Sequence, residues 1–418
     1  MKLHKSLFFL LLLAVAGCKK YDIAPLVKDP AYIRVFNDLS NDIDVFHSAQ
    51  VAPFLTFLMD PKTDGDVPND AEIIGDYMGI RQLYSLSYPV NEANSSIGTG
   101  TLNSGQPGSA PVINLYPLNY EYPGNAHVLT APVMNGFDLS AWAQISSGKH
   151  RIMFVVRPQN NIPFKELAST IRSRVLLDTT VNFEKGEVYT LEVVSRDLDN
   201  GKYGLYIRHE QFVHQAFDEN KLYIGFVNLS GKKPLDNQQG FGNYIGDNVR
   251  ISTTYNLFND AVYATQADVV YDAYPEYKDT YMTTLNTKMD TGISFQPLPL
   301  LPESAFFYQG ILRSYYAFSN NNVFFGTLPY YSFNLLDADK PVTDPDSRLG
   351  YLLRCHRDPS SYNNYSSRDN NRSAPNLNLL VNSGNGYHVY STVNIMEIVY
   401  DRVYTMQLQR GFNNVPKN

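Results

Sequence analysis

The segment from His209 to His214 carries the residue types of a zinc-protease motif, with Glu210 directly after the first of two histidines. In that motif the histidines lie four residues apart on one helix face, where they bind zinc while the glutamate acts as general base. Here the second histidine is one residue further on, and on a helix it would turn away from the first. The spacing therefore argues against a metalloprotease.

Aspartates gather in two stretches that could supply the oxygen ligands that calcium requires. They are Asp60, Asp64, Asp66 and Asp70 in the first, and Asp337, Asp339, Asp344 and Asp346 in the second. Neither stretch has the spacing of an EF-hand, and Asp beside Pro or Gly is also typical of turns. We interpret both stretches as turns, and we predict no metal and no cofactor.

Other catalytic patterns lack support in the sequence. The chain has no glycine-rich phosphate loop and no Gly-x-Ser-x-Gly nucleophile elbow. His356 follows Cys355, but neighbouring residues of a strand point to opposite faces, so this order does not indicate a nucleophile and its base. We predict a protein that is not an enzyme, and a hydrolase with a cleft between domains remains an alternative.

One long segment, 357–375, is rich in Asn and Ser, which is typical of a solvated loop or a binding loop. Within it, aromatic rings could stack on sugars and guanidinium groups could donate hydrogen bonds to them. We therefore name a candidate ligand-binding loop made of Tyr362, Tyr365, Arg368 and Arg372. Most of the other tyrosines lie at strand positions where a structural role suffices.

The start of the chain predicts a lipid anchor. Lys2 and Lys5 precede an unbroken apolar run, 7–16, which is too short to cross a bilayer and is typical of a signal peptide. The run ends in Val15-Ala16-Gly17-Cys18, which resembles the lipobox of bacterial lipoproteins. We expect residues 1–17 to be a signal peptide, Cys18 to carry the lipid, and residues 18–30 to form a tether.

The predicted lipid anchor indicates where the protein is located and what it contacts. Lys19-Lys20 after the cysteine differs from the aspartate-led pattern of inner-membrane retention, so the resemblance implies the outer membrane, on its periplasmic or cell-surface face. A formal net charge of −7 argues against nucleic acid as a partner. The expected partners are the membrane, through the lipid, and a glycan or an envelope protein.

Alternating apolar residues predict many short strands. Ile33 and Val35 alternate in one run, Leu222, Ile224 and Phe226 in another, and the run 151–156 is apolar on both faces. Helix-length periodicity is missing, which favours an all-β fold. We predict two tandem immunoglobulin-like β-sandwich domains, 31–215 and 216–418.

The same patterns predict one duplicated strand and one hairpin. The run 188–193 is similar to the run 403–408, which suggests that the closing strand of the first domain is duplicated in the second. The run 181–183 is followed by 188 across a four-residue turn containing Gly186. This arrangement predicts a hairpin in which the glycine adopts a positive φ.

These segments resemble the domain of unknown function 4397 family. The resemblance rests on Asn37-Asp38-Leu39-Ser40, on Gly148-Lys149-His150-Arg151, and on the run 177–181 leading into 186–191. It covers most of residues 31–208 but only the two ends of 222–412. It implies a Bacteroidetes-type envelope lipoprotein with immunoglobulin-like β domains, and it implies no catalytic residues.

Together these patterns predict a lipid-anchored cell-envelope protein that acts as a non-catalytic binding or structural module. Two alternatives of other kinds remain open. One is a surface glycan-binding component of a polysaccharide-uptake system, and the other is a fimbrial or adhesive subunit that assembles by strand exchange.

Overall fold

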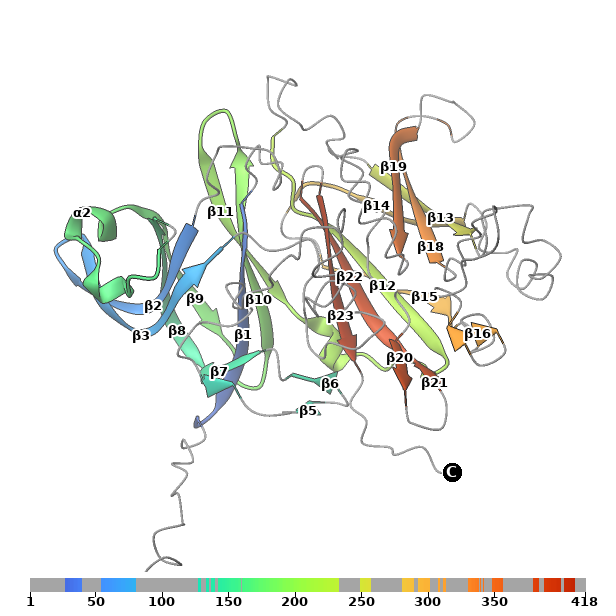
Figure 1. Cartoon of the computed structure of the whole chain (residues 1–418), viewed down its shortest axis with the longest axis horizontal. Helices are drawn as coiled ribbons and strands as arrows, with labels where there is room; N and C mark the ends of the chain where they lie inside the picture. Colours follow the sequence, from blue (N-terminus) through green and yellow to red (C-terminus); the bar gives the residue numbers. More distant parts are fainter. Residues whose placement is uncertain are drawn as a thin grey trace, which may run out of the picture.

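The computed structural model (Figure 1) confirms an all-β protein. The helical elements among the described residues are short: η1 (Phe164–Glu166), α2 (Ser169–Arg172) and η2 (Gln211–His214). The structure describes residues 27–39, 54–79, 127–128, 133–134, 137–139, 142–158, 160–232, 249–256, 280–288, 292–300, 307–308, 311–312, 330–337, 339, 341, 348–355, 379–382, 387–399 and 402–409.

The strands of the described residues form four main sheets. Sheet 1 has the order β3-β2-β8-β9, sheet 2 the order β11-β10-β1-β7-β4, sheet 3 the order β15-β12-β22-β23, and sheet 4 the order β14-β13-β18-β19. Sheets 1 and 2 contain β1 (Pro30–Asp38), β2 (Phe54–Asp64), β3 (Val67–Met78), β4 (His127–Val128), β7 (Ala143–Ser146), β8 (Gly148–Arg157), β9 (Val175–Phe183), β10 (Val188–Asp197) and β11 (Lys202–His209).

Sheets 3 and 4 come from the second half of the chain. Their strands are β12 (Lys221–Asn228), β13 (Val249–Asn256), β14 (Thr280–Leu285), β15 (Gln296–Pro299), β18 (Tyr330–Asp337), β19 (Arg348–Cys355), β22 (Thr392–Val399) and β23 (Arg402–Gln409). Two-stranded ribbons are formed by β5 (Val133–Met134) with β6 (Phe137–Asp138), β16 (Phe307–Tyr308) with β17 (Ile311–Leu312), and β20 (Leu379–Asn382) with β21 (Tyr387–Tyr390).

Sheets 1 and 2 pack face to face around one apolar core. Ile33 and Val35 of β1 are fully buried in it, as their alternation predicts, together with Leu191 of β10. Phe57 and Phe154 meet edge to face across β2 and β8, with ring centroids 5.4 Å apart. Burial of each such side chain stabilises the fold by about 1.5–3 kcal/mol, so this core explains why the strands keep one register.

The other face of sheet 2 packs against sheet 3, so the two halves of the chain share a second core. Val188 and Val194 of β10 lie in one cluster with Val393 and Ile395 of β22. Residues 188–195 of β10 and the whole of β22 are buried, because each strand is covered on both faces. The stack of sheets 1, 2 and 3 is visible in Figure 1.

The four strands of sheet 3 are arranged like strands β7, β1, β10 and β11 of sheet 2, although the duplicated strand differs from the one predicted. Strand β1 pairs in parallel with β10, with Tyr32 opposite Val188, and β12 pairs in parallel with β22, with Tyr223 opposite Val393. The counterpart of β10 is therefore β22, and the prediction that 188–193 corresponds to 403–408 was wrong. Run 403–408 lies in β23, whose place matches β11. Period-two alternation is common to strands in general, so it does not show which strand of one sheet corresponds to which strand of the other.

The predicted hairpin between 181–183 and 188 was also wrong. Strand β9 pairs with β8 in sheet 1, whereas β10 pairs with β1 and β11 in sheet 2. The four residues between β9 and β10 thus cross from one sheet to the other. Gly186 does adopt the predicted positive φ, at 78°. Its backbone N–H donates to Pro30 O at 2.7 Å and fixes this crossing to the start of β1.

Within the described part of the chain, no helix has both the length and the apolar character needed to cross a membrane.

Candidate functional site

The residues predicted to carry function lie outside the described residues. This applies to the lipid attachment residue Cys18 and to the candidate loop residues Tyr362, Tyr365, Arg368 and Arg372. For Cys355 the structure describes the backbone, which ends β19. Three polar clusters lie within the described residues, and we consider each as a site. The sequence analysis singled out His209 and His214 of the third cluster but none of the three clusters as a whole.

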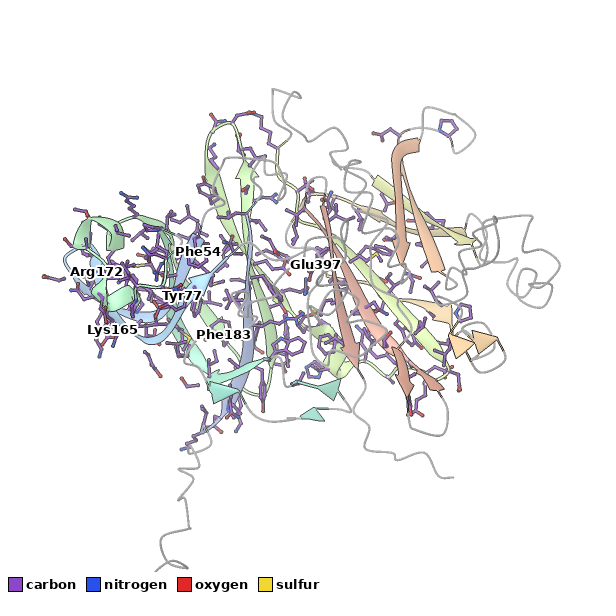
Figure 2. All side chains as sticks on the ribbon, viewed as in Figure 1. Phe54, Tyr77, Lys165, Arg172, Phe183 and Glu397 are labelled. Carbon is purple, nitrogen blue, oxygen red and sulfur yellow. The ribbon has the colours of Figure 1, made fainter. Side chains whose placement is uncertain are left out.

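The first cluster is a buried ion network between sheets 2 and 3. Arg208 of β11 contacts Glu192 of β10 at 3.0 Å, Glu210 at 2.9 Å and Glu397 of β22 at 2.7 Å. All four side chains are almost completely buried. Figure 2 shows Glu397 on β22 where the two sheets meet. One guanidinium group therefore connects carboxylates from both halves of the chain.

Neighbouring groups extend this network toward β1. Thr190 donates a hydrogen bond to Glu210 and accepts one from Arg34 Nε at 3.2 Å. The guanidinium group of Arg34 lies 4.1 Å from the ring centroid of Trp142. Burial opposes the charge on Arg208, but the carboxylates outweigh it and raise the pKa of Arg208 well above its ordinary value. Arg208 thus keeps its positive charge among the three carboxylates. The network aligns the two sheets, and its depth makes it a structural feature.

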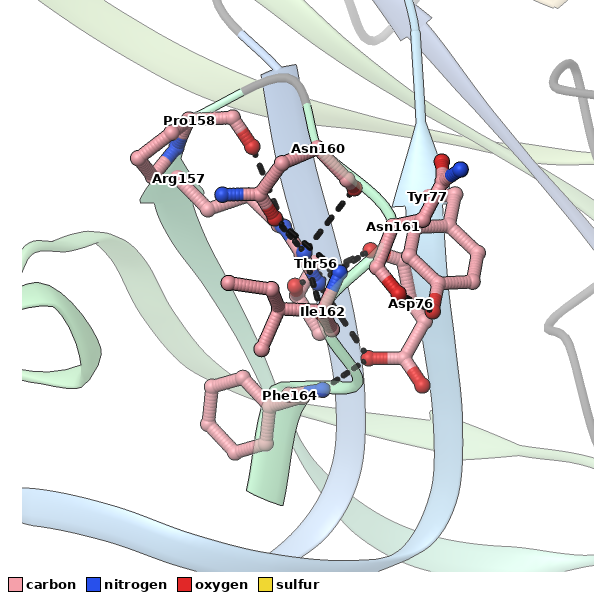
Figure 3. A network of polar contacts seen from close by, with 9 residues as sticks. All are labelled: Thr56, Asp76, Tyr77, Arg157, Pro158, Asn160, Asn161, Ile162 and Phe164. Carbon is pink, nitrogen blue, oxygen red and sulfur yellow. Dashed lines mark hydrogen bonds and ion pairs between the residues drawn. The ribbon is translucent and has the colours of Figure 1, made fainter. Parts of the chain in front are cut away.

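The second cluster fixes the loop after β8 and is drawn in Figure 3. The side chain of Arg157 is fully buried and donates hydrogen bonds to Asp76 O at 3.0 Å and to Asn160 Oδ1 at 2.9 Å, and also to Ile162 O. Asp76 Oδ1 accepts the backbone N–H of Phe164 at 2.6 Å, which fixes the start of η1. Burial raises the pKa of Asp76 and lowers that of Arg157, although each attracts the other. This cluster also serves structure.

The third cluster consists of Glu187, His209 and His214, and it is open to solvent. His209 Nε2 lies 2.6 Å and His214 Nε2 lies 2.7 Å from the same oxygen, Glu187 Oε2. The exposed fraction of these side chains is 18% for Glu187, 36% for His209 and 51% for His214. Burial opposes the charge on Glu187, but hydrogen bonds from His214 and His209 outweigh it and lower its pKa. Two imidazoles and one carboxylate thus converge at an accessible point.

Segment 209–214 is not an α-helix, so the expectation that its second histidine turns away from the first does not apply. His209 is the last residue of β11 and His214 the last of the 3-10 helix η2. The turn between these elements brings both rings together, with centroids 6.4 Å apart. Glu187 is the residue that sequence reasoning missed as a partner. The register that places Tyr189 opposite His209 brings Glu187 beside the cluster, and it depends on recognising the β10–β11 hairpin.

The first aspartate stretch forms a turn only between Asp64 and Asp66, because Asp60 lies within β2 and Asp70 within β3. Asp64 ends β2, Gly65 follows with a positive φ of 58°, and Asp66 precedes β3. Asp60 contacts His150 at 2.6 Å, and Asp70 contacts Lys165 at 2.7 Å. In the second stretch, Asp337 ends β18 and Asp339 is exposed, whereas 344 and 346 lie outside the described residues.

Comparison with solved structures finds four matching chains, one of which is described here. No protein-family model matches the chain, and no curated relative was found. A crystal structure of a candidate cell adhesion protein from Bacteroides ovatus aligns over 94% of this chain and 100% of that one, with 8% identity and a TM-score of 0.16. Because this TM-score is far below that of a shared fold, the proposals below rest on residues of this chain alone.

Proposed function

We propose that this chain is a lipid-anchored protein of the bacterial outer membrane that acts as a non-catalytic binding or structural module. The core shared by sheets 2 and 3 carries the structural part of the proposal, because it joins the two halves into one stack. Because β10 and β22 are each covered on both faces, the stack of sheets is suited to holding surface loops at a fixed distance from an anchor. The buried networks around Arg208 and Arg157 act in the same way, since they position strands and loops.

The anchoring part of the proposal rests on Cys18 after its short apolar run. Replacing Cys18 with serine is expected to move the protein from the membrane fraction to the soluble fraction. A serine hydroxyl does not accept the thioether-linked lipid, and each acyl CH₂ contributes about 0.8 kcal/mol to membrane binding. Cell fractionation and labelling with a fatty-acid probe measure this.

The matched control is Cys355→Ser, because Cys355 is the other cysteine of the chain. We expect this variant to stay labelled and membrane-bound. If Cys18→Ser left labelling, processing and fractionation unchanged, the proposed anchor and the location inferred from it would be incorrect.

The alternative to a solvated loop is that 357–375 binds a glycan, to which its Tyr and Arg side chains are suited. If so, the double change Tyr362→Ala with Tyr365→Ala should reduce retention of the full chain on immobilised polysaccharides at least tenfold, since stacking on sugar rings would be lost. Tyr281→Ala is the control, because Tyr281 is an exposed tyrosine on β14. Equal retention of the double variant would contradict the glycan ligand, and released oligosaccharide would contradict the absence of catalysis.

A further inference from the structure

The cluster of Glu187, His209 and His214 has the composition of a transition-metal site. Its three ligand atoms, two imidazole nitrogens and one carboxylate oxygen, all lie within 4.8 Å of one another. Imidazole nitrogen with a carboxylate oxygen is a donor set that zinc accepts, whereas calcium and magnesium favour oxygen ligands alone. Three protein ligands would leave a fourth zinc position open to solvent.

The backbone that carries these ligands is well fixed. Glu187 O accepts the N–H of Tyr32 at 2.9 Å, which ties the β9–β10 crossing to β1. The ring of His209 stacks on that of Tyr189, its register partner, with centroids 5.0 Å apart. In η2, Phe212 and Val213 are buried in the core shared with sheet 3. The ligands are thus held by three separately anchored elements, which lowers the entropic cost of ion binding.

The distances require only a small adjustment. In a tetrahedral zinc site with bonds of about 2.0–2.1 Å, ligand atoms lie about 3.3 Å apart. The two observed contacts with Glu187 Oε2, 2.6 and 2.7 Å, are shorter because hydrogen bonds now occupy the place of an ion. The two imidazole nitrogens lie within 4.8 Å of each other. The exposed side chain of His214 can shift to adjust its distances to both Glu187 and His209 without disturbing the core.

A neighbouring residue can hold one imidazole in the orientation that zinc requires. Gln211 Nε2 lies 2.7 Å from His209 Nδ1, the ring nitrogen that faces away from Glu187. When Nε2 of His209 binds an ion, its proton resides on Nδ1, and rotation of the Gln211 amide presents an oxygen to accept that proton. Ligating histidines generally have such a partner on the second nitrogen.

From this geometry we propose that Glu187, His209 and His214 bind one zinc ion at the junction between the two halves of the chain. His214 ends η2, and β12 begins at Lys221, so the ion would tie the connecting segment to the edge of sheet 2. Zinc binding here requires neither the lipid anchor nor a glycan ligand.

Calorimetric titration of the full chain with zinc chloride tests the site. We expect one zinc ion to bind per chain, and we expect calcium chloride to produce no binding. His214→Asn should weaken zinc affinity at least tenfold, because it removes one of three ligands while leaving the core intact. His209→Asn and Glu187→Gln should do the same. Zinc should raise the unfolding temperature of the unchanged protein and have little effect on that of His214→Asn.

The matched control is Lys185→Gln, an exposed change two residues before Glu187 that removes no ligand. Its zinc affinity should equal that of the unchanged protein. Anomalous diffraction at the zinc edge should place the ion between the three side chains. Absence of binding at about 100 μM zinc, well above the affinity expected of a three-ligand site, would overturn the proposal. Unchanged affinity in a folded His214→Asn variant, or an ion located elsewhere, would overturn it as well.

Discussion

Replacing Arg208 with methionine is expected to reduce the free energy of unfolding by about 3–5 kcal/mol. The change would leave the carboxylates of Glu192, Glu210 and Glu397 buried between sheets 2 and 3 without the cation that all three contact. Removing one partner of a buried ion pair is costly because the remaining charge stays desolvated. Urea unfolding of the full chain measures this loss.

The sheet topology suggests methionine as the replacement. Arg208 lies opposite Thr190 in β10–β11, and Met406 lies opposite Ile395 in β22–β23, at the equivalent position of the duplicated arrangement. A methionine side chain is therefore compatible with the strand at this position, so the expected loss reflects charge more than shape.

A compensated variant separates these two causes. Adding Glu192→Gln, Glu210→Gln and Glu397→Gln to Arg208→Met removes the unpaired charges, and we expect it to recover most of the lost stability. A loss below about 1 kcal/mol in Arg208→Met alone would show that the network contributes little to holding the sheets together, as for exposed pairs.

Replacing Arg157 with alanine is expected to cost a similar amount, about 3–5 kcal/mol. Its guanidinium group is fully buried and supplies hydrogen bonds to backbone oxygens of residues 76, 158, 160 and 162. Each oxygen left without a donor adds a desolvation cost, and the carboxylate of Asp76 loses its cation. Thermal and urea unfolding measure the loss, and limited proteolysis should show earlier cleavage near 158–163.

Strand β8 offers a matched control in Arg151. This arginine also pairs with an aspartate, donating to both oxygens of Asp178 at 2.9 and 2.6 Å, but its side chain is 44% exposed. Arg151→Ala should therefore cost only about 0.2–1 kcal/mol. Equal losses for the two variants would show that burial of Arg157 is not the source of its effect.

The sequence predicted which residues of a strand face the core, because this alternation depends on residues that are close together along the chain. The inward phase of Ile33 and Val35 agrees with the structure, and so does the burial on both faces of β8, which covers 152–155 of the predicted run 151–156. The positive φ of Gly186 was predictable for the same reason, since a short turn constrains its own backbone.

Strand partners were less predictable, and both errors in pairing arose there. The partner of β1 is β10, with Arg34 opposite Thr190, 156 residues away, and nothing in either strand's alternation specifies the other. The hairpin prediction for 181–188 failed because a short turn can join two sheets as readily as two paired strands. The zinc-site candidate was missed because helical spacing was applied to a strand and a 3-10 helix.

The amino-acid sequence alone was enough to predict the all-β class, the strand phases and the conformation of the turn glycine. The predicted lipid anchor also rests on the sequence alone. These features depend on residues close together along the chain. Folding established that β10 and β22 face each other across one core and that Arg208 meets Glu397 there. It also brought Glu187 to two histidines more than twenty residues away. Such contacts follow from which distant apolar surfaces are buried together, and short-range patterns do not contain that information.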